Sequence, residues 1–383
     1  MTDPRGLLLV LCCASACAAP ALTPAAAPAG AEAASVTNAP PPAAPASAAP
    51  PASTAAAPVP AAAKPLQLSA EPIALPGATA PVSLDFLFYE PGASRVWVPA
   101  GGSGSVDVFD TAKRDFTRVE GFKTVEREAH GKKRMLGPSA GAVGDGFAYI
   151  GNRASQEICA IDLHTLKKGA CLKLADPTDC VEYVPSTHEV WVTTPSTHSL
   201  VVLDAAQGKL KLKATVKVDG EPEGYALDEP HGTFLTNLED KGTTLSIDLK
   251  TRTVKSTWST GCSADGPRGI AVDSARSLVF VACTDRVQVL DGAHDGAVLG
   301  SLDTGGGLDN IDYVADKGLL YAAAGKAARL TVAKVGEHGQ LTVFASGETA
   351  QGARNAVADS SGNIYVADPQ GAHLLVLRAP EPH

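Results

Sequence analysis

Residues 266–291 read GPRGIAVDSARSLVFVACTDRVQVLD, and this stretch decides the fold. A small-residue turn precedes an alternating segment that ends at Asp273. A second apolar segment surrounds Phe280, and a third, which alternates again, ends at Asp291. Alternating apolar and polar residues between polar turns are typical of half-buried β-strands joined as hairpins. The stretch therefore predicts consecutive strands, and helix signals are nearly absent from the remainder of the chain.

The centre of this stretch, an aromatic residue flanked by apolar ones, recurs seven times. The aromatic residues are Trp97, Tyr149, Trp191, Phe234, Phe280, Tyr321 and Tyr365. They lie 52, 42, 43, 46, 41 and 44 residues apart, and such a period is typical of one four-stranded blade of a β-propeller. The sequence therefore predicts an all-β, seven-bladed β-propeller of four-stranded blades. We expect these aromatic side chains to pack in the core between neighbouring blades.

The repeats also resemble a known family. Residues 266–291 look like the YVTN repeat of the YVTN/YncE-like propellers, and residues 362–368 (GNIYVAD) look like the related NHL repeat. The resemblance covers roughly residues 66–380 and implies the ring fold, but it implies no single function because propellers serve many tasks. Most repeats end their third strand in Asp, whose carboxylate is expected to accept backbone N–H bonds in the next turn. Repeats two, four and six match less well.

The ends of the repeat region predict how the ring closes. Only six residues follow the strand 374–377, so the seventh repeat lacks its own fourth strand. Residues 66–68, or the nearby residues 72–75, precede the first blade as fourth strands do elsewhere. We expect this N-terminal segment to join blade seven and close the ring, which removes exposed sheet edges.

The N-terminus indicates export. The apolar run 7–13 is too short to span a bilayer and is followed by small residues, as in a signal peptide. The sequence that ends at Cys17 (ASAC) resembles a bacterial lipobox, which predicts a signal peptide over residues 1–17 and lipidation of Cys17. We therefore expect the protein to be exported and to be either periplasmic or anchored in the outer membrane. Ordinary cleavage after Ala16, giving a secreted protein, is the alternative.

Amino-acid composition distinguishes a linker from the propeller in the remainder of the chain. Residues 18–65 contain 23 Ala and 12 Pro, so they predict a disordered linker, and residues 66–383 form the propeller. The formal net charge of −9 lies on this second part. An acidic surface without a basic stripe argues against nucleic acid as a partner. We expect a monomer that meets the membrane only through its lipid anchor.

One position in each repeat is polar throughout: the residue before the innermost strand, which in propellers rims the central channel. These residues are Asp85, Ser139, Asp179, Glu223, Arg268, Asp309 and Arg354. Four carboxylates could bind a hard cation, whereas two arginines favour a ligand with its own carboxylate or phosphate. The loops between second and third strands should add Asn152, Arg153, Asn237, Glu239, Asp240, Lys241, Asp285 and Lys326. A solvated rim without a ligand is the alternative.

Two functions follow from this rim. The first is a binding module on the cell envelope for a protein, peptide, glycan or small molecule. The second is a lactonase- or lyase-like enzyme in which Asp85, Glu223 or Asp309 acts as acid or base while Arg268 and Arg354 stabilise an anion. No histidine occupies the aligned rim position, and no haem, metal or nucleotide motif is present. We therefore expect binding, with no cofactor and no catalytic residue.

Five cysteines follow the signal region. Cys262 and Cys283 should lie on one face of the fifth blade, and we predict a disulfide between them, which fits export. Cys159 and Cys171 lie on adjacent strands of the second blade, so their pairing stays open. Cys180 is the expected free, buried thiol.

Overall fold

The computed structural model describes residues 64–129, 132–263 and 265–378. The predicted signal peptide, the lipidation site Cys17 and almost all of the linker over residues 18–65 lie outside the described residues. No helix among the described residues is long and apolar enough to cross a membrane.

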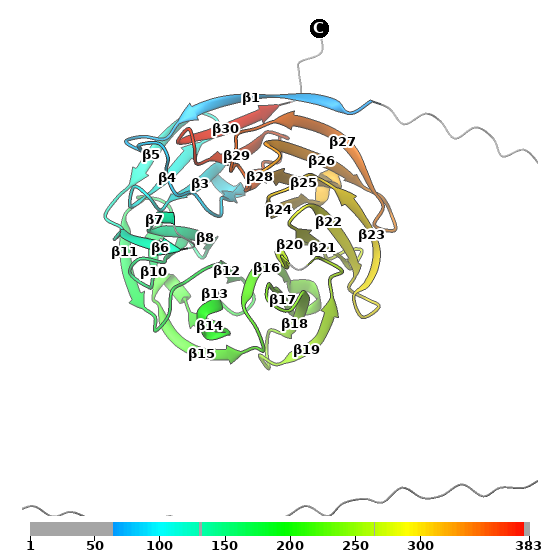
Figure 1. The fold of residues 1–383 in the computed structure, drawn as a ribbon. Coiled ribbons are helices and arrows are strands. Elements are labelled where there is room, and N and C mark those ends of the chain that lie inside the picture. The colour runs from blue at the N-terminus through cyan, green and yellow to red at the C-terminus, as the bar shows by residue number, and fades with distance from the viewer. Residues whose placement is uncertain (1–63, 130–131, 264, 379–383) are drawn as a thin grey trace, which may run out of the picture. The chain divides into compact units, whose positions relative to one another are not determined.

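The strands form seven blades arranged around a central axis (Figure 1), so the predicted seven-bladed propeller is confirmed. Blade 1 is β2 (Phe88–Glu90), β3 (Arg95–Ala100), β4 (Ser105–Asp110) and β5 (Asp115–Val119). Blade 2 is β8 (Pro138–Gly144), β9 (Phe147–Asn152), β10 (Glu157–Asp162) and β11 (Lys168–Lys173). Blade 3 is β12 (Val181–Val184), β13 (Glu189–Thr194), β14 (Ser199–Asp204) and β15 (Lys211–Lys217). Blade 4 is β16 (Pro222–Asp228), β17 (Thr233–Leu238), β18 (Thr243–Asp248) and β19 (Val254–Ser259).

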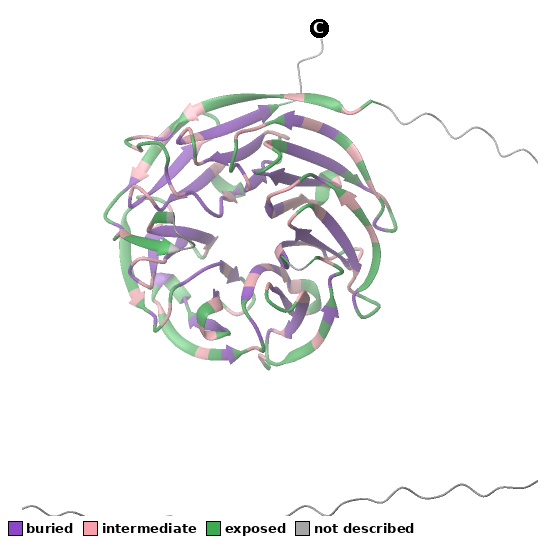
Figure 2. Cartoon of the chain, viewed as in Figure 1, coloured by how far each residue is buried: buried purple, intermediate pink, exposed green. Residues whose placement is uncertain are grey.

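The remaining blades repeat this order from the axis outward. Blade 5 is β20 (Pro267–Asp273), β21 (Leu278–Cys283), β22 (Arg286–Asp291) and β23 (Ala297–Asp303). Blade 6 is β24 (Leu308–Val314), β25 (Leu319–Ala324), β26 (Arg329–Val335) and β27 (Leu341–Glu348). Blade 7 is β28 (Ala356–Ala358), β29 (Ile364–Asp368), β30 (His373–Arg378) and β1 (Leu66–Ala74). The second and third strands are mostly buried and the outermost strands are mostly exposed (Figure 2).

Short elements connect the blades. The single-turn 3₁₀ helices are η1 (Pro91–Ala93), η2 (Pro195–Thr197), η3 (Ala206–Gly208), η4 (Glu229–His231) and η5 (Ala315–Lys317). A hairpin of β6 (Val125–Ala129) and β7 (Lys132–Leu136) is inserted between blades 1 and 2. This insertion accounts for the long spacing of 52 residues between the first two repeat aromatics.

Strand β1 closes the ring as expected. Its residues Ser69 to Ala74 pair antiparallel with β30, so it is the fourth strand of blade 7. Its first three residues, 66–68, also pair in parallel with β27 of blade 6, which the sequence did not predict. Both candidate segments therefore belong to one strand. Half-buried Leu68 packs on the core between blades 6 and 7, and half-buried Ile73 packs on the core between blades 7 and 1.

The repeat aromatics fill the core between blades, and each is at most 2% exposed. One of them departs from the pattern. Phe234 stands one position earlier on its strand than its counterparts, and a shift of one residue turns a strand side chain to the opposite face. It therefore packs on Trp191 of blade 3, with ring centroids 4.9 Å apart. Trp258 of the outer strand β19 contributes instead to the core between blades 4 and 5.

The cysteines form two disulfides. Cys262 pairs with Cys283, as predicted, and Cys159 pairs with Cys171 on neighbouring strands. Cys180 is free and buried. The aspartates that end third strands accept backbone N–H bonds in the following turn, as in the bond from Lys113 to Asp110 (2.9 Å).

Candidate ligand-binding site at the channel rim

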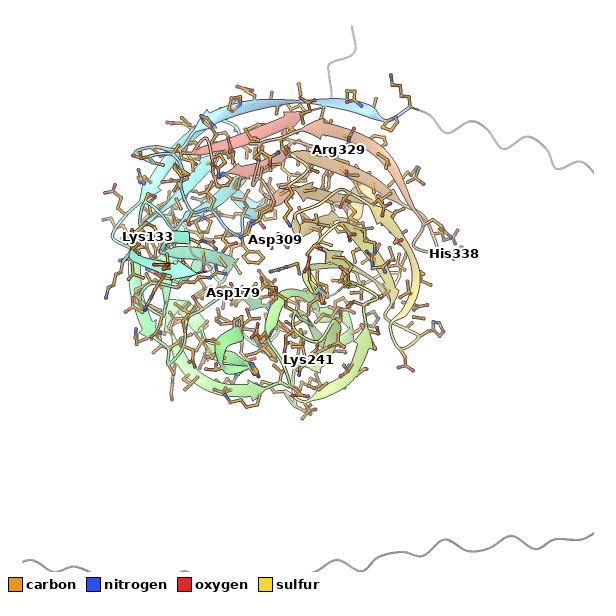
Figure 3. The ribbon with its side chains drawn as sticks, in the orientation of Figure 1. Lys133, Asp179, Lys241, Asp309, Arg329 and His338 are labelled. Atoms are coloured by element: carbon orange, nitrogen blue, oxygen red, sulfur yellow. A yellow bond between two sulfur atoms is a disulfide. The ribbon has the colours of Figure 1, made fainter. Side chains whose placement is uncertain are left out.

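The innermost strand of each blade runs in the same direction, so the residues at its start gather at one end of the channel. We call this the rim end. The seven predicted rim residues lie in or just before these strands. Figure 3 shows Asp179 and Asp309 beside the centre of the ring, whereas His338 lies at its outer edge. The structure thus brings the predicted residues to one place, while their role in binding remains a prediction.

Asp85 is the centre of the first ion-pair network. Its carboxylate is 5% exposed, and it lies 2.5 Å from Arg153 and 3.4 Å from Arg354. Arg153 continues to Asp179, and Arg354 continues to Asp309 at 3.3 Å. The network therefore joins the first, second, third, sixth and seventh blades through charged groups.

A second network lies on blades 4 and 5. Arg268 is 2.6 Å from Glu239 and 3.9 Å from Glu223. Glu239 comes from the loop between the second and third strands, as the sequence indicated. Asn237, from the preceding strand, donates its side-chain amide to the backbone carbonyl of Arg268 at 2.6 Å. Asn237 therefore holds the backbone of Arg268, and Glu239 holds its guanidinium.

Sequence reasoning missed Arg134, which comes from the inserted hairpin. Its guanidinium lies 3.5 Å from Asp85 and donates to the Ser83 hydroxyl at 3.1 Å. The only sequence signal for this residue was the spacing of 52 residues between the first two repeats. We use the name rim site for these groups together: Asp85, Arg134, Ser139, Arg153, Asp179, Glu223, Glu239, Arg268, Asp309 and Arg354.

Ser139 differs from the other rim residues because it forms no ion pair. It is 4% exposed, and its hydroxyl has no hydrogen-bond partner among the described residues. It lines a small cavity together with Arg134 and Arg153. A buried hydroxyl without a partner is uncommon, so this cavity offers a hydrogen bond to water or to a ligand atom.

The rim carboxyl groups titrate differently. Burial acts to raise the pKa of Asp85, but Arg153 and Arg354 outweigh it and hold the pKa below its usual value. Burial raises the pKa of Glu223 and of Asp309 despite nearby arginines. Burial and the neighbouring Glu223 raise the pKa of Glu239 to about 7. Asp85 is therefore a permanent anion near neutral pH, whereas Glu239 is half protonated there.

Two larger cavities open at the rim end and share Gly352 and Arg354. The first, about 560 Å³, is also lined by Lys133 and Arg134 of the hairpin. The second, about 250 Å³, is lined by Arg268, Lys326 and Asp309 as well. Together their linings contain five cationic side chains and one carboxylate, so the space open to a ligand is more positive than the network as a whole.

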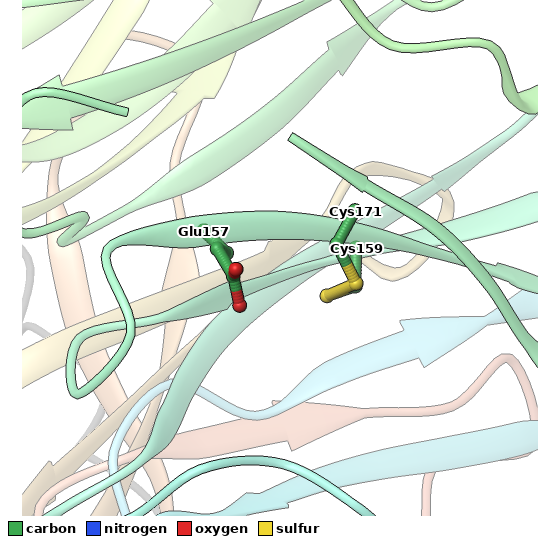
Figure 4. A group of neighbouring side chains, drawn as sticks. All are labelled: Glu157, Cys159 and Cys171. Atoms are coloured by element: carbon green, nitrogen blue, oxygen red, sulfur yellow. A yellow bond between two sulfur atoms is a disulfide. The ribbon is translucent and has the colours of Figure 1, made fainter. Parts of the chain in front are cut away.

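A possible metal-ligand group lies elsewhere, on blade 2 (Figure 4). Glu157, Cys159 and Cys171 bring their ligand atoms within 4.8 Å of one another. The two cysteines form a disulfide, and metal coordination by cysteine requires the thiolate. This group is therefore not a metal centre in the oxidised protein.

No protein-family model and no curated protein sequence matches the chain. Solved structures do match. Hydrazine synthase of Kuenenia stuttgartiensis aligns over 80% of this chain and 99% of that chain, with 14% identity and a TM-score of 0.65. A chain of the mitotic checkpoint complex aligns over 80% and 90%, with 13% identity and a TM-score of 0.63.

A structure of streptogramin B lyase is also similar. The alignment covers 82% of this chain and 98% of that chain, with 10% identity and a TM-score of 0.63. At such low identity these likenesses show the propeller fold alone. The three similar structures are a synthase, a lyase and a chain of a checkpoint complex. The fold alone therefore does not show whether a propeller is a binding protein or an enzyme.

Proposed function

We propose that this protein is a binding module that captures a ligand with carboxylate or phosphate groups at the rim end of its channel. The supporting observation is the lining of the two rim cavities, which together contain Lys133, Arg134, Arg268, Lys326 and Arg354 but only one carboxylate, that of Asp309. Arginine binds carboxylates and phosphates through paired, charge-assisted hydrogen bonds. A small molecule or an acidic peptide that carries such groups fits this chemistry.

The ion pairs at the rim favour this role because they fix the arginines before a ligand arrives. Arg354 is held by Asp85 and Asp309, and Arg268 by Glu239 and Glu223. A side chain that is already ordered loses less conformational entropy on binding. These two arginines, which line the rim cavities, are therefore held in place before a ligand binds.

A lyase-like or lactonase-like enzyme is the second candidate. The observation that favours it is Glu239, whose pKa of about 7 suits a general acid or base and whose partner Arg268 could stabilise an anion. Asp85 fits this role poorly because its pKa is lowered by three arginines. No histidine lies among the residues that line the three rim cavities described above.

We also propose that the protein is an exported lipoprotein of the YVTN type, anchored through Cys17. The two disulfides support export, because such bonds persist in oxidising compartments. Mass spectrometry of the mature N-terminus tests the anchor: a diacylglyceryl group on Cys17 is expected, and an unmodified N-terminus at Cys17 contradicts it.

Calorimetric titration tests the proposed ligand class, with inorganic phosphate, citrate and tetraglutamate as probes. The double variant Arg134→Ala with Lys326→Ala should weaken binding at least ten-fold, because each charge-assisted hydrogen bond contributes about 1.5–3 kcal/mol. Arg329→Ala is the matched control, since Arg329 is an exposed cation that lines neither rim cavity, and it should leave binding unchanged. Tetraglutamate, whose charge changes little between pH 6 and pH 8, should bind more tightly at pH 6 because Glu239 is protonated at the lower pH. Equal binding by the double variant and the control contradicts the proposal.

The same proteins test the enzyme alternative. Turnover of lactone substrates that is lost in Glu239→Gln, while the anion probes still bind, would favour catalysis over binding. Absence of turnover together with anion binding leaves the binding module as the function.

A further inference from the structure

The end of the channel opposite the rim site carries a cavity of about 720 Å³. It lies at the opposite end of the innermost strands from the rim site and includes residues of the loops that join first and second strands, such as Pro91 and Pro185. A volume of this size is within the range of small-molecule sites in proteins. We call it the lower cavity, and it shares no lining residue with the rim cavities.

The wall of the lower cavity is largely aromatic and aliphatic. Its aromatic residues are Phe86, Phe88, Tyr89, Tyr183, Tyr225 and Tyr313. These residues belong to inner strands, and to the segment just before one, on four blades. Aromatic faces attract cations, and most strongly where water is partly excluded. Such a wall accommodates the apolar body of a ligand and also favours a positive charge on it.

The charged residues of the lower cavity are all acidic. They are Glu182, Asp312 and Asp316, and none of the residues in its lining is Lys, Arg or His. This is the reverse of the rim end, where cations dominate the linings. The charged residues that line the cavities are therefore mainly cationic at the rim end and acidic at the other end.

Glu182 and Asp312 also lack the partners that the rim carboxylates have. Glu182 accepts a backbone N–H bond from Tyr183 at 2.8 Å, and Asp312 accepts one from Ala358 at 2.8 Å. Neither carboxylate forms an ion pair within the described part of the chain. Burial raises the pKa of Glu182 to about 7 and that of Asp312 to about 6. An uncompensated, partly desolvated carboxylate is costly, and a bound cation removes that cost.

Glu182 is on blade 3 and Asp312 is on blade 6, so the two carboxylates approach the axis from different sides. We propose that the lower cavity binds an organic cation, an amine or quaternary ammonium group carried on an apolar or aromatic body. The cationic group lies among the tyrosine rings and within reach of a carboxylate, and the apolar body lies against the aliphatic wall. A metal ion fits less well, because hard cations require about six oxygen ligands and this wall is mainly carbon.

Matched probes test the proposal by calorimetry at pH 7.5: 2-phenylethylamine, benzyltrimethylammonium and the neutral 2-phenylethanol. Both cations should bind at least ten-fold more tightly than the alcohol. The double variant Glu182→Gln with Asp312→Asn preserves side-chain volume and should reduce cation affinity at least ten-fold while leaving alcohol binding unchanged. Asp204→Asn, at an exposed carboxylate on blade 3, is the matched control and should behave as the parent protein.

Two further readouts separate this site from the rim. Cation binding should release protons near pH 6.5, because the ligand favours the ionised carboxylates, and buffers of different ionisation enthalpy report that release. Arg268→Ala, at the rim, should leave cation binding unchanged. Equal affinity for the amine and the alcohol, unchanged binding by the double variant, or no binding of either cation at millimolar concentration would overturn the proposal. Failure of the anion probes at the rim would leave it standing.

Discussion

Asp85 forms more ion pairs than any other residue of the rim site. Its carboxylate meets Arg134 from the inserted hairpin, Arg153 from blade 2 and Arg354 from blade 7. It is 5% exposed, so its charge is poorly solvated and depends on these partners. Three segments that are distant in sequence are therefore positioned by one side chain.

Replacing Asp85 with Asn should destabilise the protein by about 2 kcal/mol, because the partly buried Arg153 and Arg354 each lose one of their two carboxylate partners. Urea denaturation followed by tryptophan fluorescence measures the change. Asp204→Asn removes an exposed carboxylate and should change the free energy of unfolding by less than about 0.5 kcal/mol. A similar small effect at both positions would show that the network contributes little to stability.

Strand β1 contacts three blades. It pairs with β27 in parallel and with β30 in antiparallel orientation. Leu68 and Ile73 each reach a different core between blades. The closure is therefore held by backbone hydrogen bonds and by apolar contacts, and both depend on nine residues near the start of the described chain.

Deleting residues 66–74 should yield a protein that aggregates or melts at a much lower temperature, because β30 and part of β27 become open sheet edges. The single change Ile73→Asp should act in the same direction by placing a charge against an apolar core. Ala70→Asp, at an exposed position of the same strand, should have little effect. Light scattering and thermal unfolding compare the three, and equal stability of all of them would contradict the role of β1.

Several carboxyl groups, spread over different blades, have raised pKa values in the folded protein. Burial raises the pKa of Asp107 and of Asp312 to about 6, and that of Glu182 and of Glu239 to about 7. Between the unfolded and folded pKa values the native protein binds more protons than the unfolded chain. The associated stability is complete below the unfolded pKa values and is lost as the pH rises through 6 to 7.

The melting temperature should therefore fall between pH 5.5 and pH 8. Carboxylates with lowered pKa values, such as Asp85 and Asp273, act in the opposite direction only in more acidic solution. Differential scanning calorimetry measures the trend. Glu182→Gln should flatten it, because the amide cannot ionise, and a melting temperature that rises toward pH 8 would be inconsistent with these buried carboxyl groups.

Local patterns were sufficient for most of the fold. The alternation around Phe280 and its recurrence fix strands, blades and core, since the period of side chains along a strand is two and each blade needs about 44 residues. Cys262 and Cys283 could be paired because Cys262 lies just before the first strand of the fifth blade and Cys283 ends the second strand of that blade. The pattern was misleading at Phe234, where a shift of one residue reverses the face and is invisible to a search for aromatic residues.

The repeat pattern was enough to predict the seven-bladed ring, its closure by the N-terminal strand and the gathering of Asp85, Asp179, Asp309 and Arg354 at one end of the channel. The three-dimensional arrangement was needed to show which charges pair, how Arg134 reaches the rim, and that Glu182 and Asp312 line a cavity without an ion-pair partner among the described residues. The physical reason is that repeat position fixes where a backbone segment lies. Ion pairing and desolvation depend instead on side chains from different blades, whose distances no local pattern encodes.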